Sequence, residues 1–169
     1  MLSLTDIWVD QINATAGGIA GNAERVRAAY ARARAAGAKL LACPELVICG
    51  YPPEDLILRP AFIEDCMQAV HTLAELTPGG PPLLLGTPWQ HGAAVHNAAV
   101  LLKDGAVAQV QPKQVLPNFG VFDEKRLFTP GNASEIVVIE GTRLGVLVCE
   151  DLWHPAPAQA LARQGAEML

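Results

Sequence analysis

The chain has 169 residues, of which 51% are hydrophobic, and this is enough apolar material for one domain with a sizeable core. Twelve Lys and Arg residues stand against 17 Asp and Glu residues, and the basic ones are scattered apart from one Arg-rich segment, which argues against a nucleic-acid partner. No apolar run approaches the roughly 20 residues of a membrane helix, and the start, MLSLTDIWVDQ, lacks the basic segment of a signal peptide, so a cytoplasmic protein without a membrane span is expected.

Strands and helices alternate in the first half of the chain. Apolar runs, β-forming residues and an Ala- and Arg-rich stretch predict strands at 6–12, 38–43 and 82–89 and helices at about 23–36 and 61–76. Asn22 is a suitable N-cap for the first of these helices, and Gly37 is placed to end it. The segment 44–60 contains four prolines, so it is predicted to be an irregular loop of a length usually reserved for binding or catalysis.

The second half begins with a predicted hairpin. Its turn is Lys103-Asp104-Gly105, because an Asp-Gly pair favours a tight connection between two strands. The remaining expected elements are hairpin strands at 94–102 and 106–111, an irregular segment at 112–134, strands at 135–140 and 142–148, and a final helix that leads towards a further strand. Strands mixed with helices of this length indicate an α/β layered fold.

Three reactive side chains stand where predicted strands end: Glu45, Lys113 and Cys149. Ligands gather at the carboxyl ends of strands in α/β sheets. A thiol at such a place can be a nucleophile with a lowered pKa, a carboxylate can take its proton, and an ammonium can stabilise an oxyanion. Purely structural roles are also open: a small buried hydrophobe for the cysteine, a backbone cap for the glutamate and a solvated surface charge for the lysine.

The remaining candidates are weaker. Glu124 lies within FDEKR, where a surface ion pair with Lys125 or Arg126 is the default expectation. Cys43 and Cys66 are expected to pack in the core. The four cysteines include no C-x-x-C pair, the four histidines show no ligand spacing, and the glycines of TAGGIAGN match no nucleotide-binding spacing, so neither a metal nor a nucleotide site is expected.

Three segments resemble the signature regions of the nitrilase superfamily of carbon-nitrogen hydrolases, in the order Glu, Lys, Cys. They are PELVICGYPPEDL at 44–56, PKQVLPNFGVFDEKRLF at 112–128 and LGVLVCEDLWHP at 144–155. Within the superfamily, GYPPEDL, LPNFGVFDEKR and CEDLWHP, together with QINATAGGIAGN near the start, are most similar to the glutaminase domains of glutamine-dependent NAD⁺ synthetases. The likeness runs over nearly the whole chain.

The resemblance implies a role for each of these residues. Glu45 would be the general base, Lys113 would support the oxyanion, and Cys149 would attack the side-chain amide of glutamine and release ammonia. Glu124 matches a second family glutamate that orients the lysine and the substrate amine. Phe119 and Glu150 would support the substrate site; the first stands where the family often has a tyrosine, and the backbone N–H of the second would share the oxyanion.

The resemblance also implies a fold and a larger protein. Residues 1–169 would form a four-layer αββα nitrilase-type sandwich, incomplete at its C-terminus, because members of the family continue through further strands and then into an ATP-dependent domain that amidates deamido-NAD⁺. ATP and Mg²⁺ are therefore expected only in that further domain, with no cofactor in this segment. The full-length protein is expected to be a homo-oligomer.

Two other functions stay open. The chain could be a stand-alone amidase or carbamoylase of the same superfamily, because the three catalytic residues alone do not name the acyl group. It could also be a catalytically inactive fragment that serves as an interaction module. Activity on glutamine compared with simple amides separates the first alternative from the glutaminase.

Overall fold

The computed structural model describes Ser3 and residues 6–169. Met1, Leu2, Leu4 and Thr5, part of the segment assessed above for a signal peptide, lie outside the described residues. The elements in chain order are β1 (Ile7–Val9), α1 (Ile19–Ala35), β2 (Leu40–Ala42), the 3₁₀ helix η2 (Glu54–Leu58), α2 (Pro60–Ala74), β3 (Leu83–His91), β4 (Ala94–Lys103), β5 (Ala106–Pro112), α3 (Glu124–Leu127), β6 (Ile136–Ile139), β7 (Thr142–Gly145), the 3₁₀ helix η3 (Cys149–Trp153) and α4 (Pro155–Arg163). None of the described helices is long and apolar enough to cross a membrane.

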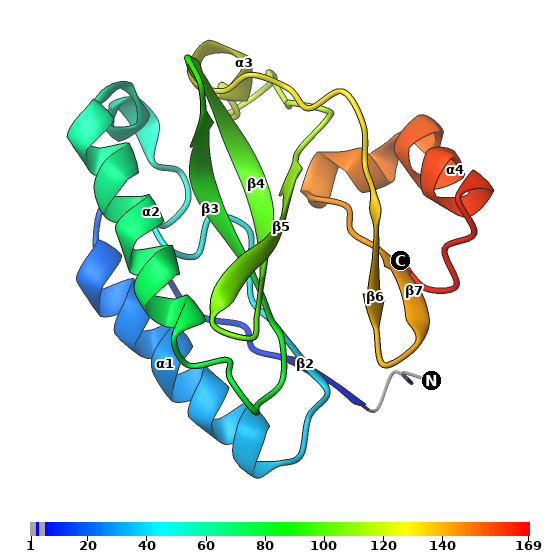
Figure 1. Cartoon of the computed structure of the whole chain (residues 1–169). Helices are drawn as coiled ribbons and strands as arrows, with labels where there is room; N and C mark the ends of the chain where they lie inside the picture. Colours follow the sequence, from blue (N-terminus) through cyan, green and yellow to red (C-terminus); the bar gives the residue numbers. More distant parts are fainter. Residues whose placement is uncertain (1–2, 4–5) are drawn as a thin grey trace.

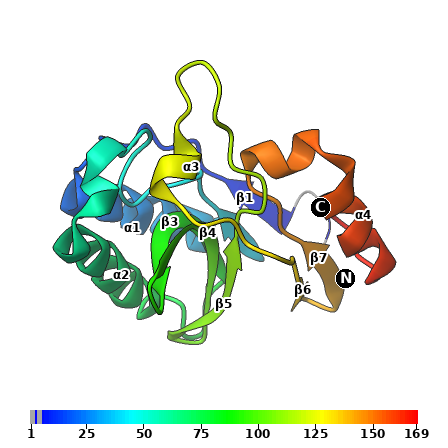
Figure 2. The ribbon, with the colours of Figure 1, turned by 90° about the horizontal axis from the view of Figure 1, so that it is seen from above.

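The strands form two sheets. The larger has the order β1-β2-β3-β4-β5, with β1, β2 and β3 parallel and β3, β4 and β5 antiparallel, and β6 and β7 form a second, two-stranded sheet. Helices α1 and α2 cover one face of the larger sheet, while the small sheet lies across from its other face with α4 beyond it (Figures 1 and 2). The described elements therefore lie in layers, as the α/β pattern of the sequence predicts.

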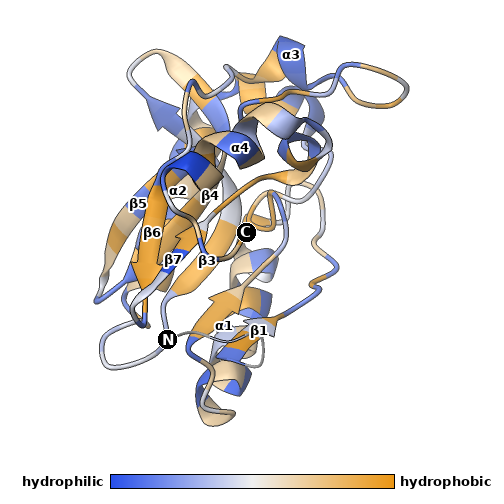
Figure 3. Cartoon of the chain, turned by 90° about the vertical axis from the view of Figure 1, so that its right-hand side faces the viewer, coloured by the Kyte–Doolittle hydropathy of each residue, from blue (hydrophilic) through white to orange (hydrophobic). Residues whose placement is uncertain are grey.

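Alternation along the strands gives the larger sheet two apolar faces. On β4, Ala98, Val100 and Leu102 belong to the core cluster beneath α1 and α2, whereas Ala99 and Leu101 belong to the cluster that contains β6 and β7. Because successive side chains of a strand point to opposite faces, a run of apolar residues is what a sheet covered on both sides needs. The hydrophobic colouring of β6 reflects its part in the second cluster (Figure 3).

Asn22 is not the N-cap of the first helix. Helix α1 begins at Ile19, and Asn22 lies fully buried inside it. Its side chain accepts a hydrogen bond from the Thr15 backbone N–H at 2.8 Å and donates to the carbonyls of Thr15 and Ile48 at 2.8 and 3.1 Å. The amide therefore ties the loop before α1 to the loop after β2, a role that depends on residues far apart in sequence.

Other boundaries agree with the sequence to within a few residues, with two exceptions. The loop 44–60 contains the 3₁₀ helix η2, and the segment 112–134 contains the short helix α3. The Asp104-Gly105 turn has the expected form, with positive φ at both positions, and so does the Glu140-Gly141 turn that joins β6 to β7. The chain beyond α4 also turns back towards the small sheet, where Met168 bridges Leu144 in parallel.

Candidate active site

The loop that carries Glu45 packs directly against the backbone of β3. A Cβ atom placed on Gly86 would lie 2.3 Å from the Leu46 amide nitrogen and 2.6 Å from the Glu45 Cα, so only glycine permits this approach. The Gly86 N–H also donates to the Pro44 carbonyl at 3.2 Å. Glu45 is thereby held by backbone contacts just beyond the end of β2, with its side chain free to meet groups from other elements.

Lys113 is buried between two carboxylates. Its residue is 1% exposed, and Nζ lies 2.7 Å from Glu45 Oε1 and 2.9 Å from Glu124 Oε2. Burial of an ammonium is expensive unless it is paired and hydrogen-bonded, and here both conditions hold. The surface alternative for Lys113 and the default surface ion pair of Glu124 are therefore wrong: Glu124 pairs with the lysine, while Arg126 pairs with Asp123 and Asp55.

Asn97 is a part of this cluster that the sequence did not reveal. Its Nδ2 donates to Glu45 Oε1 at 2.7 Å and lies 3.4 Å from Glu124 Oε2, and Tyr51 donates its hydroxyl to Glu124 Oε1 at 3.0 Å. The two carboxylates are thus held from β4 and from the loop after β2 as well as by the lysine. Their residues are 27 to 73 positions from these partners in sequence, so no local pattern points to the pairing.

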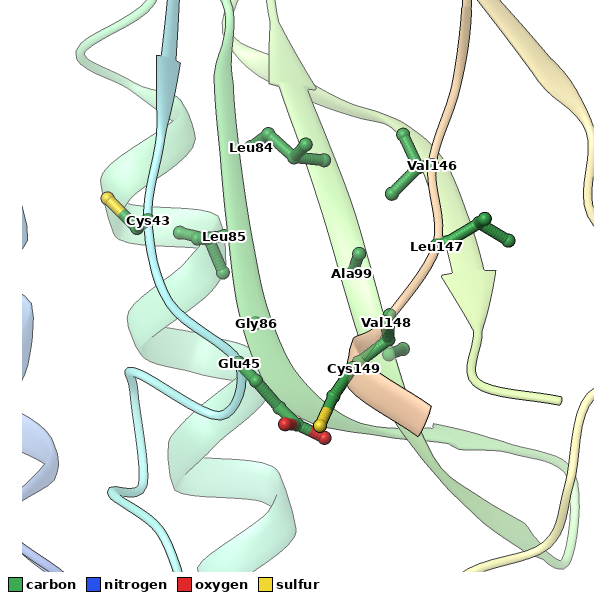
Figure 4. Close-up of a pocket in the computed structure, with 11 residues that line it drawn as sticks. Cys43, Glu45, Leu84, Leu85, Gly86, Ala99, Val146, Leu147, Val148 and Cys149 are labelled. Atoms are coloured by element: carbon green, nitrogen blue, oxygen red, sulfur yellow. The ribbon is translucent and has the colours of Figure 1, made fainter. Parts of the chain in front are cut away.

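Cys149 stands at the first position of η3, beside the Glu45 carboxylate (Figure 4). It is exposed, and its φ of +45° is a left-handed conformation that a non-glycine residue adopts only at some cost in free energy. The preceding strand β7 ends at Gly145, so the cysteine follows three residues that belong to no strand, rather than ending the strand itself. The sharp turn presents the sulfur on the same side as Glu45 (Figure 4).

The position of Cys149 after a strand suggested a lowered thiol pKa, but its surroundings raise that pKa. Burial raises the pKa of Cys149 most, and the negative charge of Glu45 raises it next. The charge of Lys113 lowers it, and a hydrogen bond to Glu45 raises it to a smaller extent. Burial alone would lower the pKa of Lys113, but its hydrogen bond to Glu45 and the two carboxylate charges raise it. Burial also raises the pKa of Glu124. A neutral thiol beside a carboxylate needs that carboxylate as a base.

Asp151 connects the turn of Cys149 to the segment after Lys113. It is 2% exposed, and its Oδ1 accepts hydrogen bonds from the backbone N–H groups of Gln114 and Val115 at 2.9 and 2.8 Å. Its Oδ2 accepts from the Val148 N–H at 3.1 Å. One buried carboxylate therefore fixes the nucleophile turn relative to the lysine.

Asp151→Asn is expected to destabilise the protein and to lower turnover, since an amide keeps one acceptor oxygen where the carboxylate uses two. A hydrogen bond to a charged group contributes about 1.5–3 kcal/mol, so the urea unfolding midpoint should fall measurably. Asp123→Asn is the matched control, because Asp123 is exposed and pairs with Arg126 at the surface. Equal unfolding midpoints for the two variants would contradict the role of Asp151.

Phe119 and Glu150 are not part of the cluster around Lys113. Phe119 is 59% exposed on the loop before α3, and its ring packs edge-on against Phe122 at 5.5 Å. The Glu150 carboxylate lies 3.4 Å from His154 Nε2. Their proposed contacts with substrate stay predictions.

A cavity of about 130 Å³ opens beside the candidate nucleophile. Cys149 and Glu45 line one end, and the rest of the wall is mostly apolar, with Leu84, Gly86 and Val146 among its members (Figure 4). Cys43 also lines it, and burial raises the pKa of that thiol to about 12, so it stays protonated and unreactive. Among the described residues, no group of three or more His, Cys, Asp or Glu side chains could hold a metal ion.

The chain is similar to known proteins over nearly its whole length. Residues 9–169 match the carbon-nitrogen hydrolase family. Glutamine-dependent NAD(+) synthetases from Rhodobacter capsulatus and Synechocystis are 46% and 42% identical over 163 and 155 residues, which is 96% and 88% of this chain. The chain spans only about 30% of the length of these relatives.

Solved structures lead to the same family. A glutamine-dependent NAD⁺ synthetase from Acinetobacter baumannii superposes with a TM-score of 0.91 at 32% identity, over 96% of this chain and 31% of the other. An amidase from Nesterenkonia sp. AN1, one structure of which records addition of acrylamide at the active site cysteine, gives 0.83 at 27% identity, over 95% of this chain and 63% of the other.

Proposed function

Because this chain belongs to the carbon-nitrogen hydrolase family, we propose that it hydrolyses the side-chain amide of glutamine through a thioester on Cys149. The observation that carries the proposal is the position of the Glu45 carboxylate, which meets the Cys149 thiol on one side and the buried Lys113 ammonium on the other. A nucleophile, a base and a fixed positive charge are the groups that acyl transfer from an amide requires.

In the first half of the reaction, Glu45 takes the proton of Cys149 while Sγ attacks the amide carbon. The C–S bond forms, and negative charge collects on the former carbonyl oxygen, where Lys113 and the backbone N–H of Glu150 stabilise it. The protonated Glu45 then gives its proton to the amide nitrogen as the C–N bond breaks. Ammonia leaves, and the γ-glutamyl group stays on the sulfur.

In the second half, water attacks the thioester carbon and Glu45 again acts as the base. The C–O bond forms, the C–S bond breaks, and the proton held by Glu45 returns to the sulfur as glutamate leaves. Glu124 keeps Lys113 in place through both steps, because it is the second carboxylate that the ammonium contacts. Its burial and its contact with the Lys113 ammonium suit a positioning role.

The larger context is also part of the proposal. The similarity to NAD(+) synthetases of more than three times this length supports a glutaminase domain within a longer protein, built on a four-layer αββα sandwich that residues 1–169 do not complete. Ammonia would pass to an ATP-dependent domain that amidates deamido-NAD⁺. ATP and Mg²⁺ would bind to that domain.

A second candidate is an amidase that acts on small aliphatic amides. The amidase from Nesterenkonia sp. AN1 has a similar fold at a TM-score of 0.83, and the cavity beside Cys149 is small and mostly apolar. Ammonia release from glutamine, compared with release from propionamide at equal concentration, separates the two functions. Faster hydrolysis of propionamide would favour the amidase.

Glu45→Gln is expected to lower glutamine turnover by at least about 10²-fold while changing the KM much less, because a neutral amide cannot accept the thiol proton during reaction. The measurement is steady-state ammonia release by the full-length protein. Glu64→Gln, on helix α2, is the matched control because that side chain is exposed and remote from the site. A Glu45→Gln protein with near-normal turnover would remove Glu45 from the role of base.

A further inference from the structure

Asn97 occupies an unusual place between the two carboxylates. It is 1% exposed on β4, and its Nδ2 donates to Glu45 Oε1 at 2.7 Å and lies 3.4 Å from Glu124 Oε2. The amide nitrogen has two hydrogens, so it can address both carboxylates at the same time. Lys113 Nζ contacts the same two side chains, and the four groups form one connected cluster.

The other end of the same amide has no partner. Among the described residues, Asn97 Oδ1 is a buried side-chain oxygen without a hydrogen bond. Leaving an acceptor buried and unpaired forfeits its hydration, and native proteins contain few such groups. The amide cannot turn to relieve this, because its oxygen would then face two carboxylates. The orientation that directs the N–H groups of Asn97 at Glu45 and Glu124 therefore lowers stability by leaving the oxygen unpaired.

We infer that Asn97 is a positioning residue that holds Glu45 in its charged, base-competent form against the thiol. The inference rests on the function proposed above and extends it. A hydrogen bond to the charged form of a carboxylate favours that form, and a second donor beside Lys113 matters because Glu124 adds a like charge to the same site. The charged and titratable groups that face Glu45 are Lys113, Glu124, Cys149, Tyr51 and Cys49.

Asn97→Leu removes the donor and keeps the branched shape of the side chain. We expect kcat for glutamine hydrolysis at pH 7 to fall about 10- to 100-fold, the value of one hydrogen bond to a charged group, with little change in KM. The acid limb of the kcat/KM profile should move to higher pH, because the variant lacks a donor that favours the charged form of the base. The melting temperature should change little, because the variant loses the hydrogen bonds to the two carboxylates but also removes the unpaired oxygen.

Gln111→Met is the matched control on the neighbouring strand. Gln111 is also a buried amide, 5% exposed, but it donates to the Ala133 carbonyl and accepts from the Glu135 N–H, both at 3.0 Å, so both of its ends are used. We expect the reverse result: a lower melting temperature and an unchanged pH profile. Asn97→Asp, which keeps the shape but puts an acceptor against Glu45, should lose more activity than Asn97→Leu.

The experiment uses the full-length protein and separates two kinds of failure. Wild-type protein that releases no ammonia from glutamine contradicts the proposed function. If the wild-type protein is active and the Asn97→Leu variant has the same turnover and the same acid limb of the kcat/KM profile, only the inference about Asn97 is contradicted. Loss of turnover with an unmoved acid limb and a lowered melting temperature would also overturn it, since that pattern is structural damage.

Discussion

Cys149→Ala in the full-length protein is expected to abolish NAD⁺ formation from glutamine and to spare NAD⁺ formation from free ammonia. In the proposed reaction only the nitrogen source depends on the thiol, because the sulfur forms the γ-glutamyl thioester and takes no part in amidation of deamido-NAD⁺. The exposed sulfur beside Glu45 is the single thiol placed for this attack among the described cysteines, since Cys49 and Cys66 are fully buried and burial raises the pKa of Cys43 to about 12. The measurement is NAD⁺ produced with each nitrogen source at saturating ATP.

Cys66→Ala is the control for the loss of a thiol as such. Cys66 packs in the core on α2, as the sequence predicts, and its replacement by a small apolar residue should keep most of the glutamine-driven activity. If Cys149→Ala lowers the ammonia-driven reaction as much as the glutamine-driven one, the nucleophile assignment does not hold. Such a result would mean that the substitution damages the whole protein.

Lys113→Met is expected to lower glutamine turnover by about 10²- to 10³-fold, which is the usual loss when one oxyanion donor is removed. Methionine keeps the length of the stem and removes the charge, so the buried Glu124 and the half-buried Glu45 lose their shared cation. Breaking a buried ion pair in this way costs about 3–5 kcal/mol when the remaining charge cannot be neutralised. Both effects are measurable, the first by ammonia release and the second by thermal unfolding.

The stability loss of Lys113→Met should depend on pH. Burial already raises the pKa of Glu124, and Lys113 acts in the opposite direction, so the variant raises it further. A carboxyl group with a raised pKa in the folded state stabilises that state when protonated and loses this contribution as the pH rises above about 4.3, its unfolded value. The melting-temperature difference from wild type should therefore be small at pH 5 and larger at pH 8.

Lys125→Met is the matched control, because Lys125 is an exposed lysine in the same segment. Its melting temperature should follow that of wild type at both pH values, and its turnover should be normal. A Lys113→Met protein whose melting temperature differs from wild type by the same amount at pH 5 and pH 8 would show that the carboxylates do not titrate as described.

Local signals in the sequence determined most of the described fold. The Asp104-Gly105 turn, the apolar run before Pro44, and the helix after His154 are each encoded within a few neighbouring residues, so they can be read without knowing what lies opposite. The three signature segments likewise pointed to Glu45, Lys113 and Cys149. In the structure Lys113 meets Glu45, and Cys149 stands beside the Glu45 carboxylate.

Tertiary structure alone decided how these groups are charged and held. Asn97 is 52 positions from Glu45 in the sequence and Lys113 is 68 positions from it, yet both contact its carboxylate. No local sequence pattern indicates either contact. Asp151 looked like a neighbour of the nucleophile, yet its carboxylate binds backbone groups some 36 residues earlier in the chain. Propensity and periodicity are properties of adjacent residues, whereas the energy of a buried charge depends on every group that the fold brings around it, and for that reason the pairing could be found only in three dimensions.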